Sequence, residues 1–407
     1  MASLTDSRPD LGSDTRVHGL DALRAGALLL GIGLHSLLPF LPGLPWLVSD
    51  TRSTWLAGVP VYVIHLFRMA LFMLLAGYFG RLTLQRRGPG RYLRDRMIRI
   101  LLPLVVFWPV AVLSLGVLAV INAQANGIPL VVPPPPQGPP LLMINPGQLW
   151  FLLVLMQCVA IMLAIRGLAV LLLGTQRCRQ LAAWCGGLLS HPAGGLLAAV
   201  PYTAALILQG TVLGGIIAPA TLLPSLPPVT AYLGAFTVGW ALHARADAMT
   251  RIARFWPVHL TGAVVLSAIG LSHSDPGSTT PLPLAAAGMA VAAWCWVYAL
   301  LGLGTRFLRR ERPAVRYLAD ASYWMYLIHL PLLVGFEILL VRLDWPIMVK
   351  LTLTWLVVGT ALVVSYHLLV RSTPIGRWLN RRRYPFRLPW GRTKRRATNF
   401  TWGMSSN

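Results

Sequence analysis

The sequence is poor in charge, and the little that it has is mostly of one sign. Of its 407 residues only 12% are charged and 56% are apolar, whereas about 25% charged residues is usual for a soluble domain. The 35 Lys and Arg outnumber the 12 Asp and Glu and give a net charge of +23. So apolar a chain cannot cover a soluble surface with charge. Nucleic-acid binding therefore explains the basicity poorly, and we expect a protein of the lipid bilayer.

Disulfides, metal sites and a signal peptide are also not expected. Four cysteines in a chain of this length form no disulfide framework, and we expect reduced thiols. No Cys or His pairs at zinc-ligand spacing accompany them, so we expect no metal site. Residues 1–17 carry three Asp instead of a basic start and an apolar core. The first apolar stretch is therefore expected to be a membrane span that is not cleaved.

Long apolar stretches are abundant. A helix needs about 20 apolar residues to cross the hydrocarbon core, and we count about ten such stretches. They are 22–42, 59–80, 99–121, 148–173, 196–218, 228–243, 256–272, 282–304, 318–340 and 347–370. This pattern predicts an all-α, polytopic integral membrane helical bundle with about ten transmembrane helices.

The basic residues alternate between the connections of these stretches. The start of the chain, the even-numbered connections and the tail hold most of the 35 Lys and Arg, and the odd-numbered connections hold only Arg52 and Arg342. By the positive-inside rule, both termini are cytoplasmic. We divide the chain into a cytoplasmic segment at 1–17, a transmembrane domain at 18–370 and a basic cytoplasmic tail at 371–407. The tail is expected to be disordered and near anionic lipid.

One connection, from Asn122 to Gly147, is rich in proline. It has no basic residue and is expected on the opposite side of the membrane. The run Pro133 to Pro136 predicts a stiff, extended segment. A spacer is the usual role of such a segment, and a lid over a substrate site is the alternative.

Ionisable side chains inside the apolar stretches are costly and indicate function. The first stretch contains Asp21, Arg24 and His35. The spacing puts Arg24 and His35 on one helix face, about 16 Å apart along the axis, and Asp21 can pair with Arg24. The second stretch adds His65 and Arg68, and we expect His65 at the depth of His35. A packing role is the alternative for a lone histidine, but two His and two Arg in adjacent stretches favour function.

Other polar residues extend this pattern. Arg96 and Arg99 share a face at the start of the third stretch, and Arg suits bidentate contact with phosphate. A positive-inside flank explains most of the charge there, but not why these residues face the same side as Arg24. In the ninth stretch Tyr326 stands one turn before His329, although an aromatic-rich helix is also typical of packing.

At this point the residues resemble a known family, the acyltransferase-3 membrane acyltransferases, and within it the branch that succinylates osmoregulated periplasmic glucans. The Arg, ten residues, His spacing of the first stretch is its most specific motif, and His-x-x-Arg-Met favours the glucan branch. One departure is Gln148, where many relatives have His. We also expect no appended soluble esterase-like domain. The matching blocks are Leu20 to Arg24 with His35, His65 to Met69 with Ala76 to Phe79, Arg96 to Arg99, Leu149 to Leu153, and Ser322 to Pro331.

The resemblance implies that an acyl group moves from cytoplasmic acyl-CoA to a hydroxyl of a periplasmic glucan or another glycan, at the bacterial inner membrane. Succinyl-CoA is favoured and acetyl-CoA is possible, as a donor substrate rather than a permanent cofactor. We expect His35 to be the general base, with an acyl-histidine intermediate as a variant. We expect Arg24, oriented by Asp21, to contact the donor, and Arg68 to contact the succinyl group or the oxyanion. Arg96 and Arg99 are expected to contact the CoA phosphates. His65 and His329 are expected to orient His35 or to contact the sugar, and Tyr326 and Trp150 to shape the acceptor path.

A transporter or flippase and a membrane scaffold are the two alternative classes of function. A transporter or flippase would use the same intramembrane charges to carry protons or an anion, but the sequence shows no repeated halves and no paired broken helices. A membrane scaffold leaves the alignment of Arg24 with His35 unexplained. The sequence predicts no particular oligomeric state.

Overall fold

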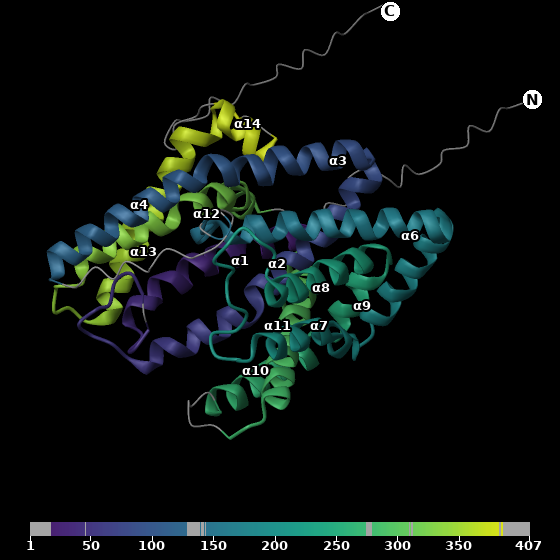
Figure 1. Ribbon diagram of the computed structural model, residues 1–407, viewed down its shortest axis with the longest axis horizontal. Coiled ribbons are helices and arrows are strands. Elements are labelled where there is room, and N and C mark those ends of the chain that lie inside the picture. Colours follow the sequence, from purple (N-terminus) through teal and green to yellow (C-terminus); the bar gives the residue numbers. More distant parts are fainter. Residues whose placement is uncertain are drawn as a thin grey trace, which may run out of the picture.

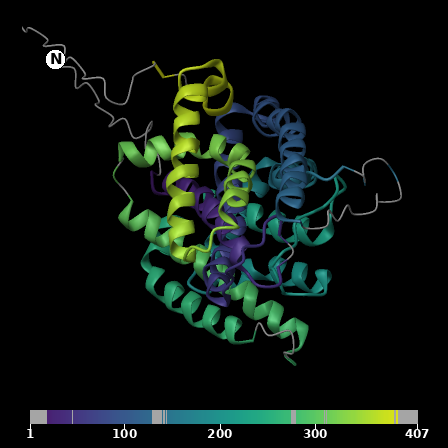
Figure 2. The ribbon, with the colours of Figure 1, turned by 90° about the vertical axis from the view of Figure 1, so that its left-hand side faces the viewer.

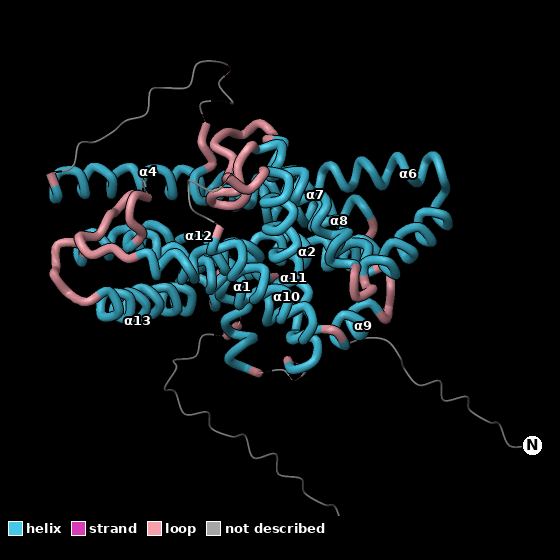
Figure 3. Tube along the Cα trace, turned by 90° about the horizontal axis from the view of Figure 1, so that it is seen from below, coloured by secondary structure: helices cyan, strands magenta, loops and turns pink. Residues whose placement is uncertain are grey.

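The computed structural model describes residues 18–381 and 384–385, except 45, 128–138, 140–141, 143, 274–278, 309 and 311. Helices make up nearly all of this part of the chain, and it contains no strand (Figure 3). The expected segment 1–17, most of the proline-rich connection and the end of the tail lie outside the described residues. The all-α prediction is confirmed for the part that the structure describes.

The α-helices of the described residues are labelled α1 to α14 in chain order, and the label α5 is not used. The short helical segments are 3-10 turns at Leu38–Phe40, Trp55–Ala57 and Gly147–Leu149, and π-helical turns at Met97–Leu101 and Tyr366–Arg371. The α-helices are α1 (His18–Leu37), α2 (Gly58–Arg87), α3 (Pro89–Arg96), α4 (Leu102–Asn126), α6 (Trp150–Leu189), α7 (Gly194–Gln209), α8 (Leu226–His243), α9 (Ala248–Arg254), α10 (Trp256–Ser272), α11 (Leu282–Phe307), α12 (Pro313–Leu340), α13 (Ile347–Ser365) and α14 (Pro374–Asn380).

All ten predicted stretches form helices, but the number of spans is smaller than expected. In the described part of the chain, seven helices are long and apolar enough to cross a membrane, or eight if the bent pair α9 and α10 forms one span. The predicted span 196–218 is cut short because α7 ends at Gln209, followed by Gly210 in a left-handed conformation. The chain is thus a polytopic membrane helical bundle of seven to eight candidate spans.

The hairpin of α1 and α2 joins two groups of helices. On one side α1 packs against α12, which contacts α4 and α13; on the other α2 packs against α8 and α11 (Figures 1 and 2). Small residues permit the closest approach. Gly77 of α2 lies against the backbone of Phe236, and Gly239 of α8 lies against the backbone of Leu74. A Cβ at either glycine would separate the helices, as expected for packing without a hydrophobic drive between spans.

The tail begins with an ordered helix, so the expectation of disorder from Arg371 onward is wrong for α14. Trp378 donates its indole N–H to the Ile98 carbonyl at 2.8 Å, and Leu379 is buried. Arg381 forms an ion pair with Asp95. Helix α14 lies against the π-helical turn Met97–Leu101 that joins α3 to α4, near the labels of these helices in Figure 1. The many arginines further along the tail obscure this short apolar segment in the composition.

Candidate active site

A pocket of about 390 Å³ opens where the basic residues of α1, α3 and α12 gather. This size is within the usual range of small-molecule sites, roughly 300 to 1,000 Å³. We call this end of the bundle the basic end. The pocket runs inward between α1, α2, α6 and α12. Its charged lining residues are Asp21, Arg24, Arg96, Arg99, Arg310, Arg312, Arg316 and Asp320.

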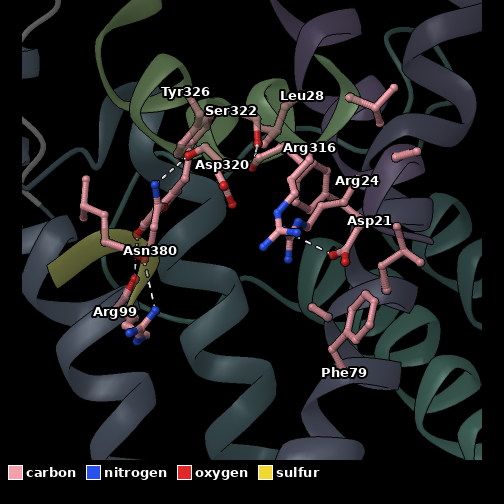
Figure 4. A pocket seen from close by; sticks show the side chains of 18 of the residues that line it. Asp21, Arg24, Leu28, Phe79, Arg99, Arg316, Asp320, Ser322, Tyr326 and Asn380 are labelled. Carbon is pink, nitrogen blue, oxygen red and sulfur yellow. Dashed lines mark hydrogen bonds and ion pairs between the residues drawn. The ribbon is translucent and has the colours of Figure 1, made fainter. Parts of the chain in front are cut away.

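Two of the predicted donor contacts occupy opposite walls of this pocket. Arg24 lies 3.4 Å from the Asp21 carboxylate, as the spacing predicts. Arg99 and Asn380 stand across from them, and Tyr326 and Ser322 lie between at the top of the view (Figure 4). The prediction that Arg24, Arg96 and Arg99 face one space is therefore confirmed.

Arg96 and Arg99 are held differently within the wall. Arg99 pairs with Asp95 at 3.0 Å and donates to the Leu379 carbonyl at 3.1 Å. The Arg96 guanidinium lies over the Tyr92 ring at 4.9 Å, and its Nε has no hydrogen-bond partner in the described residues. Arg99 thus secures α14 to the bundle, whereas Arg96 has donors left for an anion.

Four rings lead from the pocket into the bundle. Tyr326 lines the pocket and stacks on His329 at 6.0 Å between ring centroids. The His329 ring lies 5.3 Å from that of His35, and the far side of His35 is stacked on Trp46 at 5.7 Å and 18°. His329 Nδ1 lies 2.8 Å from the Tyr326 carbonyl. A carbonyl only accepts, so Nδ1 carries the proton and leaves Nε2 of the neutral ring as an acceptor.

Arg68 is pressed against α1 beside these rings. Its guanidinium contacts Gly31, one turn before His35, where a side chain would collide with it. It lies close enough to His35 and His65 to interact with them electrostatically, and close enough to do so with the phenols of Tyr232 and Tyr326. The predicted convergence of His35, His65 and Arg68 is confirmed.

His65 is held by the loop that follows α7. Its ring packs on the loop after α7, where a Cβ at Gly215 would come within 2.7 Å of His65 Cδ2. Gly215 has a φ of +67°, a conformation that side-chain-bearing residues rarely adopt. His65 is therefore positioned by a turn that requires glycine.

Trp150 lies away from the pocket, unlike Tyr326. Its ring packs at 5.9 Å from Tyr232 and at 6.4 Å from Phe151. Its predicted place on an acceptor path stays a prediction. The neighbouring Gln148 joins the site more directly, because its carbonyl accepts from the Tyr326 hydroxyl at 3.0 Å and its amide donates to the Leu327 carbonyl at 3.0 Å.

Several buried polar atoms around the rings have no hydrogen-bond partner among the described residues. Buried polar groups are normally paired, so a cluster of unpaired atoms indicates a site for a polar ligand. The arrangement offers both donors and acceptors, in keeping with the hydroxyl and carbonyl groups of an acyl transfer. These atoms are His35 Nδ1, Trp46 Nε1, Arg68 Nε and Gln148 Oε1.

Sequence reasoning missed Trp46 and part of the pocket mouth. Trp46 lies in a loop with no motif around it, and no sequence signal identifies it. Arg310, Arg312 and Arg316 were counted only as a basic connection. Their position before α12, which carries Tyr326 and His329, is a signal that links them to the same site.

Comparisons with known proteins agree with this geometry. A family model described as the acyltransferase domain (Acyl_transf_3) matches residues 17–370. "Glucans biosynthesis protein C" from Salmonella paratyphi B, Salmonella heidelberg and Salmonella dublin is in each case 31% identical over 98 residues, 24% of this chain. The chain spans 25% of the length of these curated relatives. No solved structure matches it. Because the family model covers most of the chain, the chain belongs to the acyltransferase 3 family and is a multi-pass membrane O-acyltransferase.

Proposed function

We propose that the chain transfers an acyl group, succinyl in preference to acetyl, from acyl-CoA to a hydroxyl of a periplasmic glucan or a related glycan. The observation that carries this proposal is the series of contacting rings that connects the basic pocket, through Tyr326 and His329, with His35. One end of the path suits a phosphate-bearing donor, and the other end holds a base. We further propose that all ten helical stretches belong to the membrane domain of a bacterial inner-membrane protein, with both termini cytoplasmic.

The donor would enter at the basic end. The CoA phosphates would lie near Arg96 and Arg310, whose guanidinium groups suit phosphate oxygens. The pantetheine arm would follow the pocket to Tyr326. Arg24 and His35 stand about 16 Å apart along α1, a span that an extended pantetheine covers for the most part. The thioester would then lie beside His35.

The chemistry needs one base and one site for negative charge. His35 would take the proton of the acceptor hydroxyl as the oxygen attacks the thioester carbonyl. The carbonyl oxygen becomes an oxyanion, and Arg68 would stabilise it. Collapse breaks the C–S bond, and the proton on His35 returns to the sulfur. The products are an ester of the glycan and free CoA.

Two observations support a succinyl donor. Arg68 is a cation inside the bundle whose Nε has no hydrogen-bond partner among the described residues, so a succinyl carboxylate would supply the missing negative charge. The matched relatives are named for glucan biosynthesis. The acceptor side would receive the glucan at the end of the bundle opposite the pocket.

The test is acyl transfer by purified protein in vesicles. With labelled succinyl-CoA and a periplasmic glucan, we expect an ester product and free CoA from the wild type. His35→Ala should lose most transfer, since a general base contributes about 10²- to 10⁴-fold. Transfer near the wild-type rate in His35→Ala would show that the base is misassigned.

A transporter without covalent chemistry is the outcome that would overturn the proposal. Such a protein would release no CoA and would not be stabilised by acyl-CoA against heat. Mass spectrometry of periplasmic glycans from cells with and without the gene identifies the acyl group and its acceptor together. An unchanged glycan mass in both cells would refute the proposed acceptor.

A further inference from the structure

The loop after α1 folds back over the end of the bundle opposite the basic pocket. We call residues 41–44 and 46–54 the cap loop. Val48 is 1% exposed and packs in a small apolar cluster with Val334 and Ile338 of α12. The Leu47 carbonyl accepts a hydrogen bond from the Asn122 amide of α4 at 2.8 Å. The cap loop is thus a packed part of the structure.

Two ion pairs fasten the cap loop to the start of α13 and the residues before it. Lys350 Nζ donates to both Asp50 oxygens, at 2.8 and 2.7 Å, and the two side chains are only 1% and 4% exposed. At the surface Arg52 pairs with Asp344 at 2.6 Å, and this hydrogen bond lowers the pKa of the Asp344 carboxyl. The buried pair fixes the geometry of the loop far more strongly than the exposed pair.

This anchored loop places Trp46 on His35. The indole and the imidazole are nearly parallel, 18° apart, with centroids separated by 5.7 Å. The Trp46 N–H is buried and unpaired among the described residues, and so is Nδ1 of the same histidine. The Trp46 N–H and His35 Nδ1 therefore belong to two stacked rings, and neither has a hydrogen-bond partner among the described residues.

We propose that Trp46 forms the acceptor subsite: its N–H binds one oxygen of the incoming sugar while His35 takes the proton of a neighbouring hydroxyl. This inference rests on the proposed function. His329 links His35 to the donor pocket on one side, so an acceptor arriving from the opposite end meets Trp46 first. Sugars present hydroxyls on adjacent carbons, and this suits a donor and a base held side by side.

The same contact gives Trp46 a second effect. Its ring covers His35 from the side of the cap loop and thereby limits the access of water to the base before an acceptor binds. Water at this position would hydrolyse the thioester instead of allowing transfer. Trp46 therefore favours the sugar hydroxyl over water.

Trp46→Phe tests the hydrogen bond, because the ring remains and the N–H is lost. We expect the acceptor KM to rise about tenfold, the effect of one lost hydrogen bond of about 1.4 kcal/mol. The loss should appear in the acceptor KM rather than in kcat, because His35 and the donor pocket are left in place. Trp294→Phe is the matched control, because its indole N–H is also buried and unpaired among the described residues but lies on α11, outside the series of rings. This variant should leave the acceptor KM unchanged. An unchanged KM in Trp46→Phe, or equal rises in both variants, would overturn the acceptor subsite while leaving acyl transfer established.

Trp46→Ala tests the covering of His35 without any substrate. Diethyl pyrocarbonate reacts with accessible imidazoles, and peptide mass spectrometry reports the labelling of His35. We expect faster labelling in Trp46→Ala than in the wild type, with faster succinyl-CoA hydrolysis, and size-exclusion chromatography in detergent checks that the variant is folded. Equal labelling would refute the covering role. A wild type that neither transfers nor hydrolyses would refute the proposed function, while the labelling result would stand by itself.

Discussion

Arg68 combines two features that seldom occur together in a membrane helix. Its guanidinium lies inside the bundle among histidines and phenols, and its Nε has no hydrogen-bond partner in the described part of the chain. A cation in such a place is expected to serve a ligand. Its side chain is positioned by contact with Gly31 of α1. Gly31 and Arg68 therefore both affect the proposed contact of Arg68 with the acyl donor.

The ligand of Arg68 can be identified by comparing donors. In Arg68→Ala we expect the loss of kcat/KM, relative to the wild type, to be about tenfold or more greater for succinyl-CoA than for acetyl-CoA. The reason is that hydrogen bonds to charged groups contribute about 1.5 to 3 kcal/mol. The measurement is CoA release with each donor at matched acceptor concentration. Equal losses for the two donors would refute the carboxylate contact and leave only the oxyanion role.

The position of Arg68 can be tested without removing it. A Cβ at Gly31 would run into the guanidinium, whereas a Cβ at Gly33 would meet no atom within 4 Å. Gly31→Ala should lower kcat by about 10²-fold, because a small misplacement at a reacting centre has effects of that size. Gly33→Ala, on the same helix, is the control and should keep wild-type activity. Similar activity in both variants would mean that Arg68 moves aside freely.

At the scale of elements, the buried pair of Asp50 and Lys350 connects the cap loop to α13. Lys350→Met leaves a buried carboxylate unpaired, in a region that also holds the unpaired Glu337. We expect the free energy of unfolding to fall by about 3–5 kcal/mol. The double variant Asp50→Asn with Lys350→Met should recover most of this loss, because position 50 then carries no buried charge that needs a partner.

Thermal unfolding in detergent measures these effects. The matched control is Arg52→Gln at the exposed pair with Asp344, whose side chains are 45% and 82% exposed. This variant should cost about 1 kcal/mol or less. A double variant as unstable as Lys350→Met alone would contradict the explanation from unpaired charge.

Elements differ in how far they could be predicted. Hydrophobic length identified the ten long apolar stretches as helical. The hairpin of α1 and α2 predicted the meeting of His35, His65 and Arg68, because these residues lie on two helices that follow one another in the chain. The contacts of the cap loop could not be predicted. They join Asp50 to Lys350, 300 residues apart in sequence, and nothing local specifies such a pairing. The short helix α14 was missed because its apolar residues are few.

At the scale of the whole molecule, orientation in the membrane follows from the distribution of Arg. The free thiol of Cys178 lies on the α6 segment beyond Gly174, expected on the cytoplasmic side. A membrane-impermeant maleimide should label Cys178 only after the cells are opened. A cysteine introduced as Ser53→Cys in the cap loop should react in spheroplasts with an intact inner membrane. Labelling of Cys178 in sealed spheroplasts would show that the bundle has the opposite orientation in the membrane.

The series of rings from Tyr326 to Trp46 has a consequence for the energetics of the cell. In the proposed orientation the coenzyme never leaves the compartment in which it is made and recycled. Only the acyl group passes beyond His35, and it leaves as an ester of the acceptor. The free energy of a thioester formed on one side of the membrane is thereby used on a side that contains no activated donors. Such a protein needs neither an ion gradient nor a nucleotide to modify sugars outside the cytoplasm.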